Sequence, residues 1–214
     1  MSAKPRSLLL VFLLLLSIGW LSFSVIWKKT ASKRVNSNNE IYSEVSHLFK
    51  KLQLQAEEAK LFVKEKGYNE NICFLIDMSI ASGQNRFFVY DLLKDTTRNA
   101  GLVTHGRCNQ YWLQGRKYGN TVGCGCTSLG KYKVGISYKG RFGLAYKLHG
   151  LDKTNNKAFE RFVVLHSHDC VPETGVKEDI CQSDGCPTVS PGFLQYLKPI
   201  INASRKPVLL WIYE

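Results

Sequence analysis

The chain has 214 residues, 44% of them hydrophobic and 21% charged, which are ordinary values for one globular domain with an N-terminal appendage. Its net charge of +12 is spread along the chain, with no basic stripe interleaved with aromatic residues and no nucleic-acid motif. This distribution argues against a nucleic-acid-binding protein, whereas a basic surface suits an anionic wall polymer, lipid head groups or general solubility.

An apolar segment occupies the N-terminus. Leu8–Trp27 is a run of 20 residues without a charge, long enough to cross a bilayer as a helix. No Ala-x-Ala cleavage site follows, so we expect residues 1–27 to be an uncleaved transmembrane anchor, with a cleaved signal segment as the alternative. Basic residues between positions 28 and 34 would, by the positive-inside rule alone, hold the following domain in the cytoplasm.

Residues 28–39 are rich in Lys, Ser and Asn and are predicted to be a linker. Residues 40–66 then carry apolar side chains at helical spacing, and Gly67 is a typical helix stop. After it come short aromatic or β-branched runs separated by Gly, Asn and Ser, which predict strands. The predicted strands are Ile72–Met78, Arg86–Leu92, Arg98–Thr104, Lys131–Tyr138, Phe142–Leu148, Phe162–His166 and Val208–Tyr213, and Phe193–Ile201 is a predicted short helix.

Seven cysteines are many for a cytoplasmic domain of this size and indicate an oxidising compartment. The odd number leaves at least one thiol unpaired if no bond is intermolecular, as a nucleophile would require. Cys170 and Cys181 are separated by ten residues, and we predict a disulfide that closes this loop.

A second group of cysteines has two interpretations. His105, Cys108, Cys124 and Cys126 could ligate zinc, but Cys-x-Cys is tighter than the usual spacing of structural zinc sites. An oxidising compartment favours a disulfide from Cys108 to Cys124 or Cys126, and Cys126 could otherwise pair with Cys73. We therefore predict no zinc at this group of residues.

The candidate chemistry lies between positions 163 and 187. The apolar residues 163–165 lead into His166 and His168, and Ser183-Asp184-Gly185-Cys186 follows some 16 residues later. Cysteine attacks as the thiolate, histidine is its usual base, and a preceding glycine allows a tight turn whose N–H groups face an oxyanion. In a chain with five histidines the alternative is that His166 and His168 simply end a strand and Cys186 belongs to a disulfide.

These residues resemble the catalytic domain of the murein L,D-transpeptidases. That family has a His, then roughly 14 to 17 residues, then Ser/Thr-x-Gly-Cys, and both His166 and His168 match this spacing to Ser183. The resemblance extends over residues 40–214. Further matching segments are Ile76-Asp77-Met78-Ser79, Arg86-Phe87-Phe88-Val89-Tyr90-Asp91, Thr104-His105-Gly106, Ser128-Leu129-Gly130, Tyr138-Lys139-Gly140-Arg141-Phe142-Gly143 and His149-Gly150-Leu151-Asp152.

The resemblance implies a role for each site residue. Cys186 is the expected nucleophile and His166 the expected base, with His168 as the fallback base or an orienting neighbour. Gly185 and Cys186 are expected to supply oxyanion N–H groups, and Ser183 to shape the loop.

Asp184 departs from the best-known family members, which have His before the Gly-Cys pair. A carboxylate beside a thiolate raises the thiol pKa, so we expect Asp184 to face solvent or a basic residue. The loop that contains Tyr111, Trp112, Arg116 and Tyr118 is a candidate wall of the substrate groove.

The expected protein is therefore mostly β (α+β), a sandwich-like L,D-transpeptidase domain over residues 40–214. As the resemblance implies, it would form L,D-crosslinks between peptidoglycan stem peptides through an acyl-enzyme, with L,D-carboxypeptidase side activity. No metal and no organic cofactor is expected for this chemistry. Its expected place is the cell envelope, anchored in the inner membrane and facing the periplasm, or exported if the segment is cleaved. The alternative is a membrane-tethered, catalytically inactive wall-binding module. A thiol–disulfide protein is a third option, but the chain has no Cys-x-x-Cys.

Overall fold

The computed structural model describes residues 42–43 and 45–214. The predicted membrane segment and linker lie outside these residues. Within the described ranges, no helix is long and apolar enough to span a bilayer. Contacts divide the chain after Lys51, and the domain discussed below is the compact unit Leu52–Glu214.

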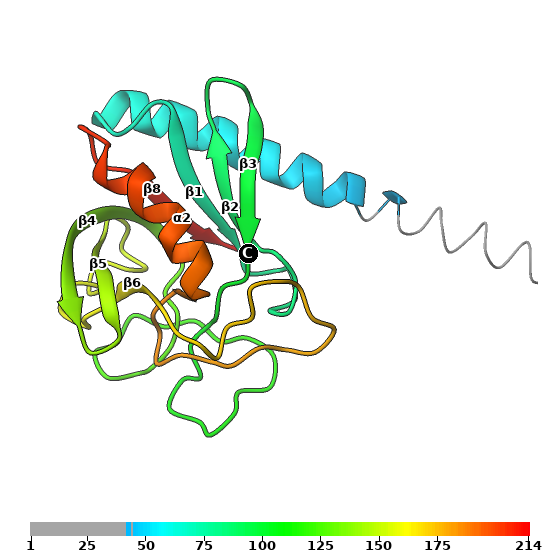
Figure 1. Cartoon of the computed structure of the whole chain (residues 1–214), viewed down its shortest axis with the longest axis vertical. Helices are drawn as coiled ribbons and strands as arrows, with labels where there is room; N and C mark the ends of the chain where they lie inside the picture. Colours follow the sequence, from blue (N-terminus) through cyan, green and yellow to red (C-terminus); the bar gives the residue numbers. More distant parts are fainter. Residues whose placement is uncertain (1–41, 44) are drawn as a thin grey trace, which may run out of the picture. The chain divides into compact units, whose positions relative to one another are not determined.

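Eight strands form one sheet in the order β3-β2-β1-β8-β4-β5-β6-β7 (Figure 1). The β1–β8 and β6–β7 pairs are parallel, and the other neighbours are antiparallel. The sequence led us to expect a sandwich-like domain, and the structure instead places all these strands in a single continuous sheet. The strands are β1 (Ile72–Asp77), β2 (Phe87–Asp91), β3 (Thr96–Gly101), β4 (Gly130–Gly140), β5 (Gly143–Gly150), β6 (Val164–Ser167), β7 (Thr188–Val189) and β8 (Leu209–Tyr213).

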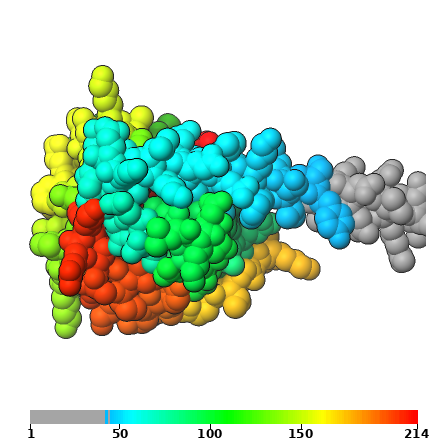
Figure 2. Space-filling view, turned by 90° about the horizontal axis from the view of Figure 1, so that it is seen from above, coloured from blue at the N-terminus to red at the C-terminus, as the bar shows by residue number. Residues whose placement is uncertain are grey.

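Two helices cover opposite faces of this sheet. Successive residues of β1 point to opposite sides, so Phe74 packs in the same cluster as Phe193 of α2 (Pro191–Asn202), whereas Leu75 packs in the cluster of the N-terminal helix. That helix is described over residues 45–66, and Ala59 is one of its fully buried residues. In Figure 2 its cyan part forms one outer surface of the molecule. Burial on both faces explains why β1 is a continuous apolar run.

Every predicted strand overlaps an observed one, and the predicted helix 193–201 is α2. Ser190 caps this helix by accepting a hydrogen bond from the Phe193 N–H, and Pro191 occupies its first turn, where a missing N–H costs nothing. The two-residue strand β7 was not predicted. It matters here because it pairs with β6 and begins two residues after Cys186.

Candidate active site

His166 and Cys186 line one cavity where β6 and β7 run side by side. In the β6–β7 register His166 is opposite Thr188, so Cys186, two residues earlier, lies beside the start of β6. A cavity of about 500 Å³ opens over this place. Its lining residues are Thr104, Arg107, Tyr111, Trp112, Phe142, His166, His168, Cys170, Cys181, Gln182, Ser183, Asp184, Cys186 and Thr188.

The imidazole of His166 is buried and held in one tautomer. Nδ1 lies 3.1 Å from the carbonyl oxygen of Ser167, which can only accept, so Nδ1 carries the proton. Nε2 is then an acceptor, and the hydroxyl of Thr188 donates to it at 3.0 Å. Burial lowers the pKa of His166. The hydrogen bond to the Ser167 carbonyl raises it by less than burial lowers it, and the nearby His168 lowers it slightly further. The side chain is therefore neutral at pH 7 and presents a basic nitrogen.

Phe142 and His168 border the same imidazole. The Phe142 ring stacks on that of His166, with centroids 5.0 Å apart and planes at 15°. It meets His168 edge-on, at 5.4 Å. His168 itself is exposed at the rim, where its Nδ1 accepts a hydrogen bond from the Cys170 N–H.

The thiol of Cys186 is half-buried against the backbone before β6. It donates to the Phe162 carbonyl oxygen at 3.8 Å, and the sulfur accepts from the Val164 N–H at 3.5 Å. Burial raises its pKa, and Asp184 adds to the rise, whereas the Val164 N–H and Arg161 lower it. Among the described residues the thiol has no hydrogen bond to either histidine. The resting state is thus a protonated thiol beside a neutral imidazole.

The loop before Cys186 is held by Ser183. Its hydroxyl donates to the Cys186 carbonyl oxygen at 2.7 Å and accepts from the Gly185 N–H at 3.1 Å. Gly185 has a φ of 108°, and a Cβ there would lie 2.7 Å from the Cys126 carbonyl oxygen. Only glycine therefore fits between this loop and the Cys126 segment.

Asp184 faces a basic residue, one of the two surroundings expected from the sequence. Its Oδ1 accepts a hydrogen bond from Arg107 Nε at 2.7 Å, and this carboxylate raises the pKa of Arg107. The guanidinium partly offsets the negative charge that Asp184 brings to the rim of the cavity.

The described residues contain two disulfides. The predicted bond between Cys170 and Cys181 is confirmed, and both residues line the cavity. Of the alternatives for the second group, Cys108 pairs with Cys126, which removes two of the four residues considered for zinc. Cys73 is a buried free thiol, not a partner of Cys126. Cys124 and Cys186 are free and half-buried.

The chain matches the model of the L,D-transpeptidase catalytic domain over residues 44–213. It belongs to that family. The resemblance drawn from the sequence is therefore confirmed.

Solved structures give weaker likenesses. The chain is similar to an L,D-transpeptidase from Mycobacterium smegmatis, with 12% identity, a TM-score of 0.42, and coverage of 67% of this chain and 59% of that one. It is also similar to the helical cell shape determining protein Pgp2 from Campylobacter jejuni, with 14% identity, a TM-score of 0.45, and coverage of 67% and 47%. The K307A mutant of Pgp2 gives 13%, 0.47, 69% and 48%. The chain thus spans about half the length of these proteins, and no curated protein sequence matches it.

Arg161 is one residue of this L,D-transpeptidase domain that sequence reasoning missed. Its guanidinium donates to the Gly119 carbonyl oxygen at 2.9 Å, to the Ser128 hydroxyl and to the Cys126 carbonyl oxygen. It also lies under Gly185, where a Cβ would be 3.2 Å from one guanidinium nitrogen. Arg161 thus ties the Cys126 segment to the loop of the candidate nucleophile and supplies positive charge there.

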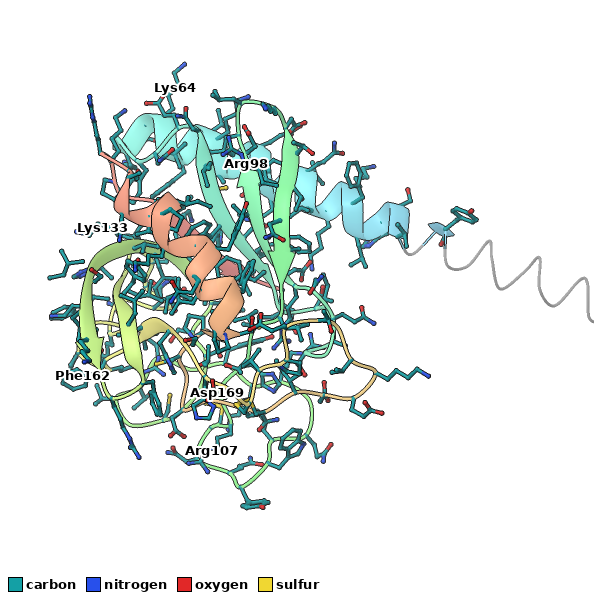
Figure 3. The ribbon with its side chains drawn as sticks, in the orientation of Figure 1. Lys64, Arg98, Arg107, Lys133, Phe162 and Asp169 are labelled. Carbon is teal, nitrogen blue, oxygen red and sulfur yellow. A yellow bond between two sulfur atoms is a disulfide. The ribbon has the colours of Figure 1, made fainter. Side chains whose placement is uncertain are left out.

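Only part of the loop that was predicted to form a wall of the substrate groove lines the cavity. Tyr111 and Trp112 line the cavity, and the Tyr111 side chain is almost fully exposed. Arg116 instead pairs with Glu214 at 3.7 Å, and Tyr118 packs against the core. Figure 3 shows Arg107 and Asp169 among the loops below the sheet.

Proposed function

We propose that this chain is an active L,D-transpeptidase with Cys186 as nucleophile and His166 as base. The observation that carries the proposal is the free Cys186 thiol and the neutral His166 imidazole, which border one cavity of about 500 Å³ in a chain of this family. Cys186 would attack the carbonyl of the third residue of a peptidoglycan tetrapeptide, at its L-centre, and release the terminal D-Ala.

Activation requires the side chains of Cys186 and Thr188 to turn. The Cys186 S–H now points to the Phe162 carbonyl, and Nε2 of His166 is occupied by the Thr188 hydroxyl. Thr188 has a second acceptor within reach, the Cys186 carbonyl oxygen at 3.4 Å. When Thr188 turns to it, Nε2 is free to take the thiol proton. Catalytic hydrogen bonds of this kind commonly tighten only when substrate binds.

His166 suits this role better than His168. Its burial keeps it neutral and its Nδ1–H is anchored by Ser167, so the basic nitrogen has a fixed direction. His168 is exposed and uses Nδ1 to accept a backbone N–H. We assign His168 to the rim, where it orients Phe142.

The developing oxyanion needs backbone donors close to the sulfur. We assign the Cys186 N–H to this task first, because the Gly185 N–H is already donated to the Ser183 hydroxyl. The Gly185 N–H becomes a second oxyanion donor when its hydrogen bond to the Ser183 hydroxyl breaks. Ser183 then keeps only its hydrogen bond to the Cys186 carbonyl oxygen.

The acyl-enzyme is resolved by an amine of a neighbouring stem, which gives the L,D-crosslink. Water in place of the amine gives L,D-carboxypeptidase activity. A location on the envelope side of a membrane belongs to the same proposal, and the two disulfides support it, because such bonds persist in oxidising compartments.

The test is release of D-Ala from a disaccharide-tetrapeptide by the purified full-length chain. Cys186→Ala is the inactive variant, and Cys124→Ala is the matched control, since both thiols are free and half-buried. We expect D-Ala and a crosslinked dimer from wild type and Cys124→Ala, and neither from Cys186→Ala. Absence of product from folded wild type with a free Cys186 thiol would favour the inactive wall-binding module.

A further inference from the structure

Cys124 is a free thiol whose sulfur lies beside the Cys108–Cys126 disulfide. It accepts a hydrogen bond from the Cys126 N–H at 3.4 Å. A Cβ placed on Gly119 would lie 3.4 Å from the sulfur of Cys124 and 3.5 Å from that of Cys126, so the two sulfurs border one point. Cys124 is half-buried and does not line the cavity of Cys186. The proposed acyl transfer makes no use of this thiol.

Hydrogen bonds hold both neighbours of Cys124 against the segment of Cys108. The Cys108 N–H donates to the Gly125 carbonyl oxygen at 3.0 Å, and the side-chain amide of Asn109 donates to the Gly123 carbonyl oxygen at 2.7 Å. Cys124 lies between these two contacts in the chain. Its thiol is therefore a second candidate partner for the Cys108 sulfur.

The backbone around this group adopts conformations that favour glycine. Cys108 has a φ of 52° and Asn109 a φ of 60°, both in the left-handed region. Such residues cost free energy, and they cluster at sites that change state. Gly123 and Gly125, on either side of Cys124, are left-handed as well, with φ of 77° and 62°. These glycines let the Cys124 segment turn at little steric cost.

The Cys108–Cys126 disulfide joins two segments that both contact the loop before Cys186. In the first segment, the His105 carbonyl oxygen accepts a hydrogen bond from the Ser183 N–H at 2.9 Å, and the Arg107 N–H donates to the Ser183 carbonyl oxygen at 2.8 Å. Arg107 directly precedes Cys108 and is labelled among the loops below the sheet in Figure 3.

The second segment contains Cys126 itself. Its carbonyl oxygen accepts a hydrogen bond from Arg161 and would lie 2.7 Å from a Cβ placed on Gly185. A change in the disulfide partner of Cys126 therefore acts directly on the backbone beside the candidate nucleophile.

We propose that Cys108, Cys124 and Cys126 form a thiol–disulfide exchange site, in which the disulfide moves from Cys108–Cys126 to Cys108–Cys124. Cys124 loses its proton to solvent, and its thiolate attacks the Cys108 sulfur. The new S–S bond forms while the Cys108–Cys126 bond breaks, and Cys126 leaves as a thiolate that takes up a proton. One disulfide replaces another, so no oxidant or reductant is consumed.

The two forms differ beside the nucleophile. In the observed form the disulfide fixes Cys126, whose carbonyl oxygen holds Arg161 close to the loop of Cys186. In the exchanged form this tether is lost, and Cys186 becomes less reactive because Arg161 no longer stabilises its thiolate as well. Exchange thus lowers the reactivity of the nucleophile without modifying it.

The experiment follows the disulfide in the full-length Cys186→Ala chain, where the candidate nucleophile cannot take part. The protein is moved from about pH 5 to about pH 8, quenched in acid at intervals and alkylated. Fragment mass spectra then show which cysteine carries the label. Cys124→Ala in the same background removes the attacking thiol, and Cys73→Ala is the matched control, because it removes another free thiol.

We expect label to appear on Cys126 at a rate that is independent of protein concentration and rises about tenfold per pH unit below the thiol pKa. Cys73→Ala should leave this rate unchanged, and Cys124→Ala should abolish the labelling of Cys126. Label that stays on Cys124 alone in folded protein would overturn the proposal. So would label on Cys108, which would mean a bond between Cys124 and Cys126.

A second measurement connects the exchange to the nucleophile. Within this group Cys126→Ala allows only the Cys108–Cys124 bond, and Cys124→Ala allows only the observed one. We expect iodoacetamide to alkylate Cys186 about threefold more slowly in Cys126→Ala than in Cys124→Ala. Equal rates would overturn the link to the nucleophile. Neither measurement depends on acyl transfer, so failure of the proposed function and failure of this proposal are distinguishable.

Discussion

Replacing Arg161 with Met removes a cation beside Cys186 and three hydrogen bonds at once. The carbonyl oxygens of Gly119 and Cys126 and the hydroxyl of Ser128 lose a charged donor. Hydrogen bonds to charged groups contribute about 1.5–3 kcal/mol each and are not additive, so we expect the unfolding free energy to fall by about 2–4 kcal/mol. The pKa of Cys186 should rise, because Arg161 lowers it.

Two assays separate these effects. Urea unfolding gives the stability, and the pH profile of iodoacetamide alkylation, followed at Cys186 by peptide mapping, gives the thiol pKa. Arg161→Lys keeps the charge but cannot reproduce the planar fork, so it should lose stability with a smaller change in the profile. An unchanged alkylation profile in folded Arg161→Met would refute the idea that Arg161 tunes the nucleophile.

Three further predictions concern the same site. Asp184→Asn removes a charge that raises the pKa of Cys186, so its alkylation profile should move to lower pH, and a move to higher pH would give Asp184 an activating role. Replacing Cys170 and Cys181 by Ser should lower the unfolding free energy by about 3 kcal/mol for a loop of this length, as measured by urea unfolding, and slow D-Ala release, because both residues line the cavity. The acidic limb of the rate of D-Ala release should have its midpoint below pH 6.5, because burial lowers the pKa of His166 and only its neutral form accepts a proton; a midpoint above 6.5 would contradict His166 as the base.

Local patterns were sufficient to find most of the elements. Alternating or continuous apolar runs, separated by Gly and Asn, predicted strands at the observed places. They do so because a strand that is buried on a sheet face needs apolar residues at regular positions. Which strands pair with one another could not be predicted from such local patterns. β1 and β8 are parallel neighbours joined by most of the chain, and no local pattern specifies that contact. β7 is two residues long, too short to show any period.

The same distinction between local patterns and distant contacts applies to the residues of the candidate site. His166 and Cys186 were predicted because their spacing is a sequence property, and Asp184 was expected on electrostatic grounds to face solvent or a basic residue. Arg161 was missed because its partners are 33 to 42 positions away and come together only when the loops fold. Its one local signal was a basic residue directly before the apolar run that begins at Phe162.

The central claim is that the sulfur of Cys186 forms a covalent bond with the donor peptide. Intact-protein mass spectrometry of the full-length chain after brief incubation with a disaccharide-tetrapeptide tests it most directly, with the adduct located by peptide mapping. We predict a mass gain equal to the donor less D-Ala, located on Cys186 and absent from Cys186→Ala. An adduct on Cys124, or none on folded protein with the Cys186 thiol free, would contradict the account.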